Sequence, residues 1–93
     1  MRTDSVVDAL QNWYASQCDE TWEHSCGIEI TNIDNPGWKV RVSGSSGKQC
    51  FKMNVERNGE DWVVVRATGS EFSGYCGPGN LNELLLLVVE WLR

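Results

Sequence analysis

Three side chains that could take part in nucleophilic catalysis lie close together in the sequence: Cys18, His24 and Cys26. Cysteine catalysis needs a thiolate, a base within hydrogen-bond reach, and a group that orients the base. Asp19 or Glu23 could orient His24, which is the single histidine of the chain. One hypothesis is therefore a small cytosolic enzyme that uses Cys18 or Cys26 with His24.

Other features of the sequence count against catalysis and against a metal. The cysteines show no C-x-x-C spacing, so the strong zinc and redox patterns are absent. A single histidine leaves any zinc site dependent on Cys50 or Cys76, which are distant in the sequence. Free cysteine is most often a small, buried hydrophobic residue. We therefore predict a protein that is not an enzyme, with no metal, no cofactor and four reduced thiols.

The same segment has the composition of a protein-recognition surface. Carboxylates surround one tryptophan and the imidazole there, and an aromatic residue ringed by polar groups carries most of the energy in many protein–protein contacts. We predict a partner-binding surface made of Asp19, Glu20, Trp22, Glu23 and His24, with Asp34 at its margin. Two alternatives stay open: Trp22 packs as a lid over the sheet edge, and Asp34 serves only its turn.

Length and charge limit the classes of partner. The chain has 93 residues and a formal net charge of −5, so we expect a single domain over residues 1–93. Nucleic acid and anionic membranes both require a basic footprint, which this composition lacks. An acidic surface favours a basic protein partner, although a modest negative charge also keeps a domain soluble.

We expect neither a secretion signal nor a membrane span. Met1 to Ser5 lead into a polar-striped segment without an apolar stretch or a small-residue cleavage site. The most apolar run, Leu84 to Val89, is far shorter than the about 20 residues that cross a bilayer. The expected location is the cytoplasm.

The apolar pattern predicts a first helix between Ser5 and Cys18. Apolar and aromatic residues recur there at three- and four-residue steps, and Ser5 with Asp8 resembles a capping box. A charged connection over residues 19–26 follows, and isoleucines then alternate with polar residues as in a strand. The Asn-Pro-Gly-Trp run at residues 35–38 fits a type II turn, with its glycine at the position of positive φ. A second strand is predicted to follow, because Trp38, Val40 and Val42 alternate with Lys39 and Arg41.

Two further strands are predicted in the second half of the chain. They begin at Phe51 and Trp62, and the Asn-Gly pair at residues 58–59 fits a two-residue type I′ turn between them. With that turn, Met53 faces Val64, so Trp62 and Val64 are predicted to point towards the core.

Residues 69–79 are rich in glycine and predict a loop before the last helix. Asn80 with Glu83 caps this helix, and its predicted inner stripe is Leu81, Leu84, Leu85, Val88 and Leu92. Its other apolar residues make it apolar nearly all round. Pairing with a second copy of the chain is therefore an open alternative.

A helix, four strands in sequence and a helix predict an α+β fold. Because the connections are too short for parallel crossovers, we expect a four-stranded antiparallel meander sheet with the N-terminal and the C-terminal helix packed on one face. The other face should be largely solvated, and it bears Lys39, Arg41, Lys52, Asn54 and Glu56.

Short runs of this sequence resemble one known family. They are Leu10-Gln11-Asn12-Trp13-Tyr14, Gln17-Cys18-Asp19, Trp22-Glu23-His24, Gly27-Ile28 and Asp34-Asn35-Pro36-Gly37-Trp38. In these runs the chain resembles the immunity protein 53 family. Members of that family sit beside bacterial polymorphic-toxin genes and are taken to protect the producing cell by neutralising a toxin. The resemblance implies that the chain binds a cognate toxin domain and blocks it, and we expect that domain to be basic.

Overall fold

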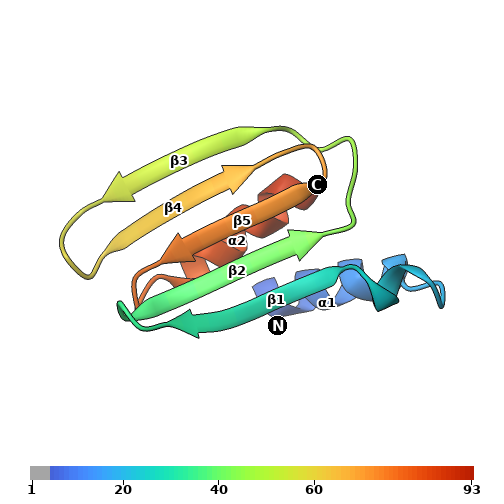
Figure 1. The fold of residues 1–93 in the computed structure, drawn as a ribbon, viewed down its shortest axis with the longest axis horizontal. Helices are drawn as coiled ribbons and strands as arrows, with labels where there is room; N and C mark the ends of the chain where they lie inside the picture. The colour runs from blue at the N-terminus through green and yellow to red at the C-terminus, as the bar shows by residue number, and fades with distance from the viewer. Residues whose placement is uncertain (1–4) are drawn as a thin grey trace.

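The computed structural model describes residues 5–93. In chain order, the elements are α1 (Val6–Gln17), the short 3-10 helix η1 (Trp22–His24), β1 (Gly27–Ile33), β2 (Gly37–Ser43), β3 (Phe51–Glu56), β4 (Trp62–Ala67), β5 (Glu71–Cys76) and α2 (Leu81–Leu92). All neighbouring strands pair antiparallel in one sheet, and α1 and α2 lie behind the same face of it (Figure 1). The predicted start without a secretion signal falls mostly on residues 1–4, outside the described part of the chain.

The sheet has five strands instead of the predicted four, in the order β1-β2-β5-β4-β3. The additional strand, β5, lies in the segment predicted as a glycine-rich loop and separates β2 from β4, so the sheet is not a meander. Phe72, Gly74 and Cys76 alternate along β5 and are buried. A Cβ at Gly74 would come within 2.6 Å of Leu84 on α2. Glycine thus occupies an inward position where a sequence pattern expects a large apolar residue.

The core fills the space between the sheet and the two helices, and the predicted α+β class is confirmed. The start of α1 agrees with prediction, because the Ser5 hydroxyl accepts the backbone N–H of Asp8 at 3.1 Å. Leu10 is the buried residue of this helix. The second helix, α2, contributes more to the core, through Leu84, Leu85, Val88 and Trp91.

The β3–β4 hairpin has a register that reverses the predicted faces of β4. Residues 57–61 form its loop, in place of a two-residue turn. Asn58 lacks a positive φ; its side-chain oxygen instead accepts two backbone N–H groups of the same loop, at 2.8 and 3.0 Å. Met53 therefore pairs with Val65 and not with Val64. Since a one-residue shift moves every side chain to the opposite face, Val65 is buried and the inward placement of Trp62 and Val64 was wrong.

The turn between β1 and β2 also differs from the predicted type II turn. The peptide bond between Asn35 and Pro36 is cis, and Gly37 lacks the positive φ that a type II turn requires. Gly37 is instead the first residue of β2, where a Cβ would collide with the backbone oxygen of Cys76. The close approach of two strands, and not the turn, requires the glycine.

Polar contacts fix the β3–β4 loop against the start of α2. The Arg57 guanidinium contacts Asp61 at 2.6 Å and Glu83 at 2.7 Å. The side-chain amide of Asn80 donates to the same two carboxylates, at 2.8 and 3.1 Å. Asn80 precedes α2 as predicted, but its side chain makes no capping bond to the helix backbone. Hydrogen bonds from Asn80 and then Arg57 lower the pKa of Asp61 below its usual range.

No described element covers the sheet face opposite the helices (Figure 1). Arg41, Lys52, Asn54 and Glu56 are exposed there and Lys39 is partly buried, so the predicted polar face is largely as expected. The register of β4 adds Trp62 and Val64 to this face, both partly buried, and Tyr75 on β5 is 38% exposed. The face is thus polar with an apolar centre.

The last helix is exposed at one apolar position. Leu86 is 50% exposed, whereas Leu87 and Val89 are partly buried. Pairing of two copies through this helix stays a prediction. Within residues 5–93, no helix has both the length and the apolar character needed to cross a membrane.

Candidate partner-binding site

The predicted site residues from Asp19 to His24 form a tight connection between α1 and β1. The Asp19 carboxylate accepts the backbone N–H groups of Thr21 and Trp22, at 2.9 and 2.8 Å. The Glu23 carboxylate in turn accepts the backbone N–H of Asp19 at 3.0 Å. The bonds from Trp22 and Thr21 lower the pKa of Asp19, because they favour its charged form. Asp19 and Glu23 therefore shape the loop with the same carboxylates that give it charge.

Trp22 joins this connection to two other parts of the molecule. Its ring packs against Trp13 with a centroid separation of 5.5 Å and against Tyr14 at 5.6 Å, both on α1. Its indole N–H donates to the backbone oxygen of Gly44, after β2, at 3.0 Å. A Cβ at Gly44 would collide with the indole, so this glycine leaves the room that Trp22 needs. The packing matches the lid alternative, and a direct contact of Trp22 with a partner stays a prediction.

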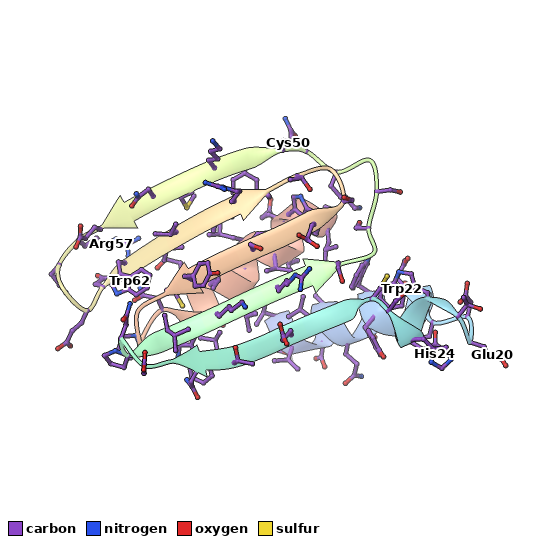
Figure 2. The ribbon with its side chains drawn as sticks, in the orientation of Figure 1. Glu20, Trp22, His24, Cys50, Arg57 and Trp62 are labelled. Carbon is purple, nitrogen blue, oxygen red and sulfur yellow. The ribbon has the colours of Figure 1, made fainter. Side chains whose placement is uncertain are left out.

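Glu20 and His24 are the outward-pointing members of the cluster. Both are exposed, and neither side chain makes a hydrogen bond or an ion pair with residues 5–93. Glu20 has a φ of 76°, a backbone conformation that residues other than glycine rarely adopt. Figure 2 shows Glu20 and His24 at one extreme of the molecule, at the opposite end from Arg57 and Trp62. Within residues 5–93, these two side chains therefore take no part in the hydrogen bonds that hold the loop.

Asp34 does not join this cluster. It is exposed in the turn after β1, whereas the connection from Asp19 to His24 precedes β1. β1 has seven residues, which at 3.3 Å per residue separates the two ends by about 23 Å. The predicted residues therefore flank one strand, and a partner that contacts both groups must span its length.

The thiol–imidazole hypothesis requires a contact that the described residues do not make. No hydrogen bond joins His24 to a cysteine in residues 5–93; the Cys18 thiol donates to the Tyr14 carbonyl at 3.3 Å. The same residues contain no group of three or more His, Cys, Asp or Glu side chains that could hold a metal. Burial raises the pKa of the Cys76 thiol to about 11, so this cysteine stays protonated at neutral pH.

The charge of the molecule is concentrated along this border of the sheet. Residues 19–34 contain five carboxylates and no lysine or arginine. They are Asp19, Glu20, Glu23, Glu29 and Asp34. Because β1 is an edge strand, residues 19–34 follow one edge of the sheet from end to end (Figure 1). We call residues 19–34 the acidic border; its charge equals the formal net charge of −5 of the whole chain.

A comparison with known protein families identifies the class to which this protein belongs. The family model described as Immunity protein 53 matches residues 7–93. The chain belongs to the immunity protein 53 family. The resemblance seen in its short motifs is thereby confirmed, and the family supports an immunity function and implies a protein partner. Comparison with curated proteins finds no match, and neither does comparison with solved structures.

Two features of the border in this immunity protein 53 member were missed by the sequence analysis. One is Glu29, an exposed carboxylate in the middle of β1 that connects the two acidic ends. The other is an apolar groove between α1 and β1, which contains the exposed side chains of Val7, Tyr14 and Ile30. The alternation along β1 could have placed Ile30 and Glu29 on opposite faces. The groove itself depends on where α1 packs beside β1, for which the sequence offers no local signal.

Proposed function

We propose that this protein binds a cognate toxin domain and neutralises it by blocking the toxin's active site or the path of its substrate. The match to the immunity protein 53 family carries this proposal. The proposed contact consists of Asp19, Glu20, Trp22, Glu23 and His24, with Asp34 at its margin. The same family relationship motivates an action in the cytoplasm of the producing cell.

Charge is the physical reason for placing the contact at the acidic border. A toxin that acts on RNA, DNA or another anionic substrate must present Lys and Arg around its active site. Carboxylates held on a short, rigid connection can occupy the positions of that substrate's anionic groups. Charge of opposite sign also accelerates the encounter of two proteins. The border's five carboxylates without a basic residue support a basic toxin as the partner.

Some side chains of the connection from Asp19 to His24 hold the loop in place, and others are available for the proposed contact with the toxin. Asp19 and Glu23 hold backbone N–H groups of the loop, and Trp22 packs on α1. Among the described residues, 5–93, Glu20 and His24 have no such internal partner, and both are exposed. Glu20 is therefore the residue whose charge can be changed with the least effect on the loop itself.

The experiment compares Glu20→Lys with Glu60→Lys, a matched control that makes the same charge change. Glu60 is exposed in the β3–β4 loop, at the other end of the sheet. Stopped-flow or surface-based kinetics would measure association with the toxin domain encoded beside this chain's gene, at low and at physiological salt. We expect Glu20→Lys to slow association about fivefold or more at low salt, and Glu60→Lys to change it by less than about twofold.

Screening by salt should reduce the difference between the two variants. Equal slowing by both variants would show that only net charge matters, and would reject the connection as the contact. An unchanged rate for folded Glu20→Lys would reject it as well.

A further inference from the structure

β1 presents an unpaired edge of the sheet. Among residues 5–93 it pairs only with β2, so alternate residues of β1 direct their N–H and C=O groups away from the sheet. Proteins usually protect such edges with charged side chains, especially Lys, with Pro, with a bulge or with a very short strand. β1 has seven residues and contains neither Lys nor Pro; its one charged residue is Glu29, whereas the opposite edge strand, β3, carries Lys52. The unpaired edge of β1 is thus open to another strand.

An apolar groove of about 420 Å³ runs beside this edge, between α1 and β1. Five large hydrophobic residues of the described chain are markedly exposed, and three of them line this groove. Val7 is 59% exposed, Ile30 41% and Tyr14 38%. Contiguous apolar surface of this kind marks an interaction site more often than scattered exposed residues do.

The charge around the groove indicates which kind of polypeptide can bind there. A second copy of the chain, paired antiparallel along β1, would bring the start of one strand beside the end of the other. The carboxylates of Glu20 and Glu23 would then meet Asp34 of the second copy, and these like charges repel. A basic segment would instead find opposite charge at both ends of β1, while Glu29 in its middle lies across from Arg41 on β2.

We propose that an extended, basic segment of the toxin domain adds to the sheet as a strand beside β1 and places its alternate apolar side chains in the groove lined by Val7, Tyr14 and Ile30. In this mode the backbone hydrogen bonds contribute affinity, and the pockets for alternate side chains determine specificity. The inference rests on the proposed function, since it describes how the same toxin domain is held. It also explains how one partner contacts both Glu20 and Asp34, because a strand along β1 passes both.

The experiment measures amide hydrogen exchange of the full chain, free and in complex with the toxin domain encoded beside its gene. In the complex, the outward-facing amides of β1 should exchange at least about tenfold more slowly, while β3 amides stay unchanged. In parallel, Ile30→Arg should weaken the complex at least about tenfold, because a cation replaces an apolar contact for a basic partner. The matched control is Leu86→Arg, at an exposed leucine on α2 outside the groove, which should change affinity by less than about twofold.

Each outcome of this experiment decides the proposal. If Ile30→Arg fails to fold, Val7→Arg on α1 changes the same groove without touching β1. A complex that forms with unchanged exchange in β1 would reject strand addition and leave the proposed function standing. If the amides of β1 in the free chain become better protected as the protein concentration rises, the occupant of the edge is a second copy of the chain. That result would also reject strand addition by the toxin domain. If no complex forms at all, both the inference and the proposed function fail.

Discussion

At the scale of single residues, the connection from Asp19 to His24 contains some side chains that hold the loop and others that are exposed to solvent. Trp22 is the main example, because its ring lies on Trp13 and Tyr14 while its indole N–H bonds to the Gly44 oxygen. An indole held on two sides fixes the loop that carries Glu20 and His24. Loss of Trp22 would therefore disturb the proposed contact indirectly, through the position of its neighbours.

We predict that Trp22→Ala lowers the free energy of unfolding by about 2 kcal/mol, because it removes both the aromatic packing and the hydrogen bond. Trp22→Phe keeps an aromatic ring but loses the donor, and should cost about 1 kcal/mol. Urea denaturation measures both values. If Trp22→Ala left the stability unchanged and weakened only toxin binding, by about 2 kcal/mol or more, Trp22 would be a partner anchor and not a lid.

At the scale of elements, the parts that local chemistry determines were predictable and the parts that depend on distant pairing were not. The Ser5 cap and helical periodicity located α1, and the apolar stripe located α2. β5 was missed because Gly74 occupies a buried strand position, where only its contact with Leu84 explains a glycine. The Asn58 side chain forms a longer loop than the Asn-Gly pair suggests, which reversed the faces of β4.

The same distinction applies to the candidate site. Its acidic and aromatic residues could be named from composition and from the family motifs. The separation of Asp34 from Glu20, and the role of Glu29 between them, depend on β1 lying at the sheet edge. The predicted meander also places β1 at an edge, whereas the apolar groove depends on where α1 packs beside β1, which no local pattern encodes.

The register of β4 makes a testable prediction about two neighbouring valines. Val65 is 2% exposed and faces the helices, whereas Val64 lies on the uncovered face. Val65→Ala should lower the free energy of unfolding by about 2 kcal/mol, because it leaves a cavity in the core. Val64→Ala should cost less than about 1 kcal/mol. Denaturant melts of the two variants test this directly. A larger loss of stability for Val64→Ala than for Val65→Ala would support the register predicted from sequence instead.

At the scale of the whole molecule, the fold separates two surfaces of different chemistry. The acidic border holds five carboxylates and no basic residue. The uncovered sheet face mixes charges of both signs, as in the ion pair between Arg41 and Glu71 at 3.0 Å. The basic partner that we propose would therefore be attracted most strongly along one edge, and this charge distribution would orient it before contact.

Survival of cells that produce the proposed toxin domain, taken from the open reading frame beside this chain's gene, tests the central claim most directly, because it requires no knowledge of the toxin's chemistry. Cells that co-produce the unmodified chain should grow as well as cells without toxin. Cells that co-produce a folded Glu20→Lys/Ile30→Arg double variant should lose most of that protection, since both the charge and the groove are altered. Failure of the unmodified chain to protect would contradict the immunity function, and full protection by the double variant would contradict its placement at the acidic border.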